Sequence, residues 1–138
     1  MVSKECIFCS IAERRMPAQV VDEDAYTLAF MDISPWRRGH ALVIPRRHAR
    51  DLLEIEPQDL AMVFATARRL AARMRERLGC ERVTLWNSCG AAAGQVVLHF
   101  HVHVIPGAND DPEVPPRLEA PVPGEEIEAV AAQLRGEA

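Results

Sequence analysis

The run from residue 98 to residue 104 alternates between histidines and apolar side chains, and this pattern restricts the fold more than any other feature of the chain. Three of the five histidines occupy every second position, at His99, His101 and His103. Because side chains of a strand point alternately to its two faces, a strand here has one histidine face and one apolar face. We therefore expect a sheet in which the histidines line a site while a core covers the opposite face, formed by Leu98, Phe100, Val102 and Val104.

Two kinds of chemistry use a row of histidines of this type. Imidazoles on a strand can bind zinc or iron, but an open metal site commonly adds a carboxylate or a distant histidine. No Asp or Glu lies between Gly90 and Ala108. Alternatively, one neutral imidazole attacks a substrate as a nucleophile while a second acts as an acid, since the ordinary pKa of histidine lies near neutral pH. The residues alone leave both the metal site and the covalent mechanism open.

Size and charge exclude several other classes of protein. A chain of 138 residues fits one domain, which we place over residues 1–138, and 49% hydrophobic residues suffice for a core. The net charge of −4 argues against a nucleic-acid partner, which requires a concentrated basic surface. The N-terminus lacks the apolar run of a signal peptide, and no stretch approaches the roughly 18 apolar residues of a membrane span. We expect a cytoplasmic protein without a membrane partner.

One long helix is the clearest element of the sequence. Pro57 suits its first turn and Gly79 its end, which predicts a helix over 57–78. Its apolar residues recur at spacings of three and four and form one stripe. The stripe consists of Leu60, Val63, Phe64, Ala67, Leu70, Ala71, Met74 and Leu78.

The remaining pattern predicts an α+β fold with a mainly antiparallel sheet. Short helices are expected over 7–15 and 125–134, and small or proline-rich residues predict loops over 89–94 and 107–123. The apolar runs predict a hairpin followed by three further strands. These strands are expected at 20–21 and 26–33, which form the hairpin, and at 40–45, 82–87 and 96–105.

The histidine run lies within a segment that resembles the signature of the histidine-triad nucleotide hydrolases and transferases. This segment has AGQ at 93–95 followed by HFHVHVIP at 99–106. Further segments resemble the family in the same order: CIFCSI at 6–11, LAFMDISP at 28–35 and GHALVIPRRH at 39–48. The resemblance covers about residues 5–106. It implies the histidine-triad fold and a two-fold homodimer in which the sheets join edge to edge.

The resemblance assigns catalytic roles to three histidines. His101 matches the nucleophile that takes the nucleotidyl group through one ring nitrogen, while the carbonyl of His99 holds the other nitrogen. His103 matches the residue placed toward the phosphate and the leaving group. His40 matches a further histidine beside the triad. Without the resemblance, His40 would be an unremarked surface histidine preceding an apolar strand.

The resemblance also implies a binding site for a purine nucleotide. Asp32 matches a carboxylate that binds ribose hydroxyls, although it could instead begin a turn with Ser34 and Pro35. Gly94 and Gln95 match a turn whose backbone approaches the phosphate, and such electrostatic contacts generally dominate phosphoryl-transfer catalysis. The apolar base pocket corresponds to residues that could equally belong to the core: Phe8, Ile11, Phe30, Ile33 and Leu42.

Two cysteines near the N-terminus have a spacing used by both metal sites and redox pairs. A redox pair usually opens a helix after a strand, and no strand is expected before Cys6 and Cys9. In some bacterial members, and in the related galactose-1-phosphate uridylyltransferases, two cysteines, a histidine and the first triad histidine bind one zinc. The resemblance thus implies one structural zinc per chain, held by Cys6, Cys9, His48 and His99. Cys80 and Cys89 have no such partners, and we expect them to be ordinary small residues.

Two positions depart from the family pattern. Val96 occupies a place that commonly carries Ser or Thr, so a hydroxyl near the leaving group is replaced by a methyl. An Asn or Gln that reaches the phosphate in the family corresponds to Ser88, with Asn87 one residue earlier. The strand register decides between these two candidates. Both departures concern the leaving group and leave the nucleophile intact.

The leading hypothesis is an enzyme that cleaves a nucleoside phosphoramidate or a dinucleoside polyphosphate through a covalent nucleotidyl-His101 intermediate. One alternative is a nucleotide-binding or scaffold protein with incidental turnover, which a panel of nucleotide substrates distinguishes. The other is a metal hydrolase that uses His99, His101 and His103 as ligands. Its metal would be bound by histidines alone, whereas our hypothesis expects one zinc bound through thiolates.

Overall fold

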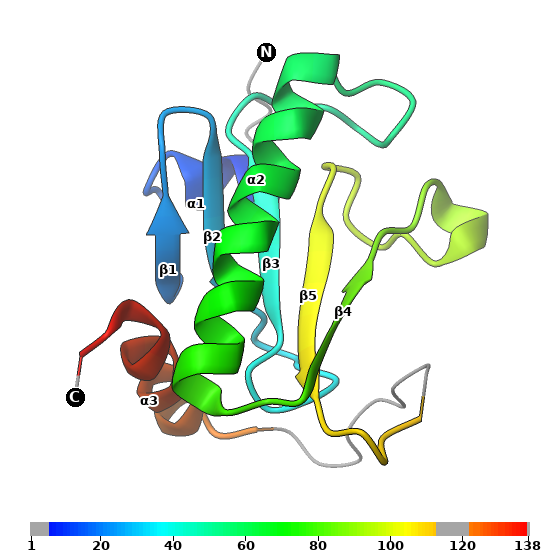
Figure 1. Cartoon of the computed structure of the whole chain (residues 1–138). Helices are drawn as coiled ribbons and strands as arrows, with labels where there is room; N and C mark the ends of the chain where they lie inside the picture. Colours follow the sequence, from blue (N-terminus) through cyan, green and yellow to red (C-terminus); the bar gives the residue numbers. More distant parts are fainter. Residues whose placement is uncertain (1–5, 113–121, 138) are drawn as a thin grey trace.

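The structure is a computed structural model that describes residues 6–112 and 122–137. Its centre is one antiparallel sheet of five strands in the order β1-β2-β3-β5-β4, so the expected α+β class is confirmed. The strands are β1 (Val20–Glu23), β2 (Thr27–Met31), β3 (Ala41–Pro45), β4 (Arg82–Trp86) and β5 (Val102–Gly107). The α-helices are α1 (Ile7–Ala12), α2 (Pro57–Arg73) and α3 (Gly124–Arg135). The sheet lies between α2 and α1, as Figure 1 shows.

The long helix packs on one face of the sheet through the expected apolar stripe. Val63, Ala67, Leu70 and Met74 are fully buried against β2, β3 and β5. Phe64, in contrast, is 41% exposed, because at about 100° per residue it lies at the edge of the stripe. The last turn, Met74–Leu78, widens into a π-helix and ends at Gly79 in the left-handed conformation. Pro57 and Gly79 thus bound the helix as predicted.

The first helix packs on the opposite face of the sheet. Its side chains Phe8 and Ile11 contact alternate residues of β2 and β3, which are Leu28, Phe30, Leu42 and Ile44. Every residue of β2 and β3 is therefore buried, as the continuous apolar runs in these strands require. His103 is the cross-strand partner of Leu42 and shares this face. The histidine face of the sheet is thus the face that α1 covers.

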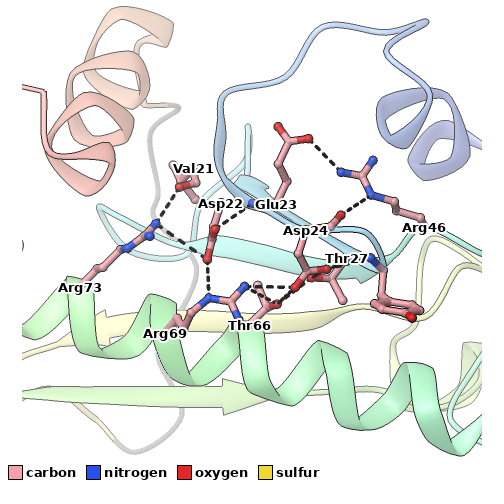
Figure 2. A network of polar contacts seen from close by, with 10 residues as sticks. Val21, Asp22, Glu23, Asp24, Thr27, Arg46, Thr66, Arg69 and Arg73 are labelled. Carbon is pink, nitrogen blue, oxygen red and sulfur yellow. Dashed lines mark hydrogen bonds and ion pairs between the residues drawn. The ribbon is translucent and has the colours of Figure 1, made fainter.

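A polar network fixes the β1–β2 hairpin to α2 and to the end of β3 (Figure 2). Arg69 of α2 donates to Asp22 at 3.1 Å and to Asp24 at 3.3 Å. Partial burial of Asp24 opposes ionisation, but the backbone N–H groups of Tyr26 and Thr27 donate to its carboxylate and hold its pKa below the ordinary value. At the end of β3, Arg46 donates to the Asp24 carbonyl at 2.7 Å and to the Ala12 carbonyl at 3.3 Å. The last of these contacts anchors α1, which carries part of the site.

The histidine strand is shorter than the sequence predicts. It begins at Val102 and not at residue 96, and Leu98 is 51% exposed although alternation assigned it to the core. The segment before Val102 is held by a different partner, the loop after β3. The Phe100 N–H donates to the Ala49 carbonyl at 2.7 Å, and the Gln95 amide donates to the Arg50 carbonyl at 2.6 Å. These bonds replace a sheet ladder, so strict alternation fails from Val96 to Leu98.

The other elements follow the prediction with small shifts of their ends. The first helix ends at Ala12, three residues before the predicted end. The loop at 89–94 contains a short 3₁₀ turn, Ala91–Ala93, and the predicted C-terminal helix is α3. Of the predicted proline-rich loop, Gly107 belongs to β5 and residues 113–121 lie outside the described residues. Among the described residues, no helix is long and apolar enough to cross a membrane.

Candidate active site and metal centre

His101 lies where the irregular segment enters β5, and its surroundings define which nitrogen is reactive. Its Nδ1 is 2.7 Å from the His99 carbonyl, which only accepts, so Nδ1 carries the hydrogen and Nε2 keeps its lone pair. Burial lowers the pKa of His101, against the opposing effects of the His99 carbonyl and Asp32. The Asn87 amide donates to the His101 carbonyl at 2.9 Å. The result is a neutral, buried imidazole with a nucleophilic Nε2.

A second chain of hydrogen bonds starts from a backbone amide and ends at His103. The Trp36 N–H donates to Nδ1 of His40 at 3.0 Å, so the hydrogen of the neutral His40 ring is on Nε2. That Nε2 lies 2.8 Å from Nδ1 of His103, to which it donates. Nδ1 of His103 is thus an acceptor, and the hydrogen of its neutral ring is on Nε2. His101 and His103 therefore present opposite functions, a lone pair and a donor, with ring centroids 5.0 Å apart.

Asp32 forms the turn that the sequence offered as its alternative role, and it also lies close to His40. One carboxylate oxygen accepts from the Ser34 N–H at 2.8 Å, which is the turn expected as the alternative. The other oxygen lies 3.6 Å from Nε2 of His40. His40 itself is fully buried, so it is no surface histidine. The turn and the histidine contact both place this carboxylate beside His40.

The four predicted metal ligands converge on a single point. Nδ1 of His99 lies 3.3 Å from Sγ of Cys6 and 3.5 Å from Sγ of Cys9. Nδ1 of His48 lies 3.2 Å from the same nitrogen of His99. All four ligand atoms lie within 4.8 Å of one another. A tetrahedral zinc separates two nitrogen ligands by about 3.3 Å and a nitrogen from a sulfur by about 3.6 Å, given its bond lengths. The geometry is therefore compatible with zinc.

The hydrogen bonds around these ligands also fit a metal site. The fully buried His99 lies with Nε2 2.9 Å from the Pro45 carbonyl, so Nε2 donates and Nδ1 is left with the lone pair that a metal requires. Burial lowers the pKa of His99 to about 4, which keeps the ring neutral. The Cys9 N–H donates to Sγ of Cys6 at 3.3 Å, so the backbone of α1 orients this sulfur.

A second group of potential ligands consists of Asp32, His40 and His103, but its hydrogen bonds are not those of a metal site. A metal-bound histidine normally donates its other N–H to an acceptor. Nδ1 of His40 instead accepts from a backbone amide, so its Nε2 already holds the ring hydrogen. Among the described residues, neither candidate group contains His101. The arrangement thus gives no support to a metal bound by all three triad histidines.

The predicted nucleotide-binding residues fall into two sets. Phe8, Ile11, Phe30 and Leu42 pack together in the core under α1, and the Phe8 ring also meets the His101 ring edge-on at 5.1 Å. Ile33, next to Asp32, is 82% exposed and lies outside this cluster. The structure thus gathers four of the apolar residues in one cluster, which meets His101 through Phe8, and leaves Ile33 on the surface.

The loop after β4 is closed by the side chain of Gln95. Its oxygen accepts from the Gly90 N–H at 2.8 Å, while its amide donates to Arg50 and Val97 carbonyls. Gly94 has a φ of 96°, which only glycine adopts readily. Ser88 accepts from the Trp86 indole at 3.2 Å, whereas Asn87 holds the strand of the nucleophile. Gln95 and Asn87 thus support the site from within the protein.

Sequence reasoning missed two residues beside His40. The Trp36 indole stacks on His103 with a centroid distance of 4.8 Å and an interplanar angle of 21°. Gly39 has a φ of 92°, and a Cβ there would lie 2.9 Å from Pro106, so the turn before His40 requires glycine. A signal existed for Trp36, because one of only two tryptophans lies in a turn between Pro35 and a catalytic histidine. Its contact with His103 could not be predicted, because the two residues are 67 positions apart in the sequence.

Comparison with known proteins agrees with this geometry. The HIT domain matches residues 13–110. A zinc-bound histidine triad family protein from Mycobacterium smegmatis is 34% identical and superposes with a TM-score of 0.84 over 96% of this chain and 91% of its own. A histidine triad nucleotide-binding protein from Sulfolobus tokodaii is 31% identical, with a TM-score of 0.85 over 95% and 90% of the two chains. A HIT family hydrolase from Legionella pneumophila is 36% identical, with a TM-score of 0.67 over 75% of this chain and 93% of its own. The fold, the match to the HIT domain and these relatives show that the chain is a member of the histidine-triad (HIT) family of nucleotide hydrolases and transferases.

Proposed function

We propose that this protein cleaves a nucleoside phosphoramidate or a dinucleoside polyphosphate through a covalent nucleotidyl-His101 intermediate. The observation that carries the proposal is the hydrogen bond from Nδ1 of His101 to the His99 carbonyl. It leaves a buried, neutral imidazole with its lone pair on Nε2, which is the form that attacks phosphorus. Similarity to a HIT family hydrolase and a histidine triad nucleotide-binding protein supports the reaction class and the ligand.

In the first step, Nε2 of His101 forms a bond to the α-phosphorus as the bond to the leaving group breaks. The leaving group departs with the electron pair of that bond. The neighbouring His103 donates a hydrogen bond from Nε2–H to the departing atom, as the hydrogen-bond chain from Trp36 and His40 dictates. Water then attacks the phosphorus, the bond to Nε2 of His101 breaks, and a nucleoside monophosphate is released. The proton that the water loses balances the proton that the departed group takes up.

The nucleotide lies, in this proposal, across the part of the site formed by α1, β2 and the loop after β4. The apolar residues Phe8, Phe30 and Leu42 face a base, while the carboxylate of Asp32 binds ribose hydroxyls. Backbone groups at Gly94 approach the phosphate. Ile33, exposed beside Asp32, is available to cover the base.

The metal centre supports catalysis indirectly. We propose one structural zinc held by Cys6, Cys9, His48 and His99, and similarity to a zinc-bound family member supports this proposal. When bound, zinc supplies a rigid connection between the N-terminal segment and His99. The carbonyl of this same residue orients His101, so the metal ligand and the nucleophile share one backbone unit.

Substitution of His101 tests the mechanism. We expect His101→Ala and His101→Asn to lower kcat by several orders of magnitude, because they remove the nucleophile, while nucleotide binding is largely retained. Turnover is measured against a panel of adenylated and guanylated phosphoramidates and dinucleoside polyphosphates. Rapid quenching of the wild-type reaction should also yield a peptide containing His101 with an added nucleotidyl mass.

Two results would contradict this function. A His101→Ala enzyme with a near-normal rate excludes the covalent mechanism. Wild-type protein that binds nucleotides but turns over no member of the panel is instead a nucleotide-binding or scaffold protein.

A further inference from the structure

Trp36 makes two separate contacts with the catalytic histidines. Its backbone N–H donates to His40, and its indole stacks on the ring of His103. The indole also meets the Trp86 ring edge-on at 6.0 Å. Trp36 is only partly buried and belongs to neither hydrophobic core cluster. Its side chain is therefore committed to the site and not to the packing of the sheet.

The two contacts restrain different motions of His103. The hydrogen bond from His40 fixes the position of Nδ1 but allows the ring to tilt about that point. The indole lies nearly parallel to the imidazole, at 21°, and so fixes the plane of the ring. The two restraints act together on the direction of Nε2–H. Small errors in this direction are costly, since a misplacement of about 1 Å can lower a rate about 100-fold.

We propose that Trp36 is a positioning residue, whose indole holds the His103 ring so that Nε2–H points at the departing atom of the substrate. This inference rests on the proposed function of the same site. The restraint matters most for substrates whose leaving group depends on a donor.

Substitution of the side chain isolates the stack, because the backbone N–H that sets the state of His40 stays in place. Trp36→Leu removes the aromatic face, and Trp36→Phe retains one. We expect Trp36→Leu to lower kcat by ~10-fold or more for alkylamine or alkoxide leaving groups, a fraction of the ~10²–10⁴ that positioned donors contribute. The loss should be less than ~3-fold for nitrophenolate, and KM should hardly change. Trp36→Phe should restore most of the difference between the two substrate classes.

Trp86→Phe is the matched control, because it removes the other tryptophan of the chain without removing the stack on His103. It should show no selective loss on poor leaving groups. If Trp36→Leu lowers kcat equally for all leaving groups, or if it acts mainly on KM, then Trp36 does not position His103 and the inference is wrong.

A measurement without turnover separates this inference from the proposed function. The chain has five histidines, so the His103 ring protons can be assigned in a carbon–proton NMR spectrum. In the wild type these protons should be shifted upfield by the indole, and Trp36→Leu, but not Trp36→Phe, should abolish the shift. An unshifted wild-type signal would overturn the inference whatever the activity. The expected upfield shift in a protein that turns over no substrate would establish the stack but disprove the proposed function. The positioning role, which depends on that function, would then be disproved as well.

Discussion

The hydrogen positions of His40, His99 and His101 are set by backbone groups that can act in only one way, and His40 in turn sets that of His103. Carbonyl groups of Pro45 and His99 accept from His99 and His101, and the Trp36 amide donates to His40. A carbonyl cannot donate and an amide N–H cannot accept, so these contacts decide which ring nitrogen holds a hydrogen. Identical side chains within one short segment therefore differ in their hydrogens: the lone pair is on Nδ1 in His99 and on Nε2 in His101, while His103 carries its hydrogen on Nε2.

Val96 is the residue at which this chain departs from the family near the leaving group. It is 83% exposed in the irregular segment before β5, whereas strict strand alternation would place it on the apolar face, opposite the histidines. Valine cannot pass a proton, and we therefore expect the wild type to favour substrates with good leaving groups. Val96→Ser should raise kcat/KM selectively on poor leaving groups, by ~10-fold, which is part of what positioned proton transfer contributes.

The comparison uses wild type and Val96→Ser with leaving groups of graded pKa. Leu98→Ser is the matched control, because it places a hydroxyl on another exposed apolar residue of the same segment. An equal effect of Val96→Ser on all substrates would show that residue 96 lies outside the proton path.

At the scale of elements, the site depends on the attachment of α1 to the sheet. Phe8 packs on the core and on His101, Arg46 holds the end of the helix, and Cys9 meets His48 and His99. A helix of six residues is too short to be stable in isolation. Its position beside the nucleophile must come from these contacts, and we expect the metal to strengthen them.

Removal of one thiolate should loosen this attachment. We expect the wild type to contain about one zinc per chain and Cys9→Ser to lose it, since metal affinity for the folded state is folding free energy. The melting temperature should fall by more than ~5 °C, because about 1 kcal/mol already shifts it by roughly 2–8 °C in a domain of this size.

Metal analysis and thermal unfolding test this expectation, and Cys80→Ser is the control at a half-buried cysteine outside the metal centre. A chelator should destabilise the wild type but not Cys9→Ser. Wild-type protein that is free of zinc and yet equally stable would show that the four ligands form no metal site.

At the scale of the whole molecule, the sheet has an edge suited to a second copy. β4 is an outer strand, and Leu85 on it is 43% exposed although its cross-strand partner Val104 is fully buried in the core under α2. Thr66 and Arg69 of α2 contact the β1–β2 hairpin, at the other side of the sheet. Phe64 lies on the opposite flank of the helix and is also exposed, so both apolar residues face the side of β4.

We expect this edge to form the two-fold homodimer that the family resemblance implies. Leu85→Lys should convert a dimer into a monomer in light-scattering and sedimentation measurements, because it places a charge in an apolar contact. Leu53→Lys alters an even more exposed leucine in the loop after β3 and should leave the dimer intact. A monomeric wild type at micromolar concentration would refute the expectation.

Local sequence patterns determined much of the fold. Apolar spacing located α2, Pro57 and Gly79 bounded it, and continuous apolar runs located β2 and β3. The family resemblance supplied the four metal ligands, which the structure brings together. These features depend on neighbours within a few residues or on an inherited motif, so the sequence carries them directly.

Tertiary structure alone decided what depends on distant partners. The loop after β3 captures residues 95–100 and ends the alternation that the histidine run predicts. Leu98 is therefore exposed, while Gln95 is buried and its side chain connects the loop after β4 to the loop after β3. Similarly, the stack of Trp36 on His103 and the tautomer of His40 follow from hydrogen bonds and ring contacts across the sheet. Such contacts arise only when the chain is packed, because no local preference encodes which backbone group an imidazole will meet.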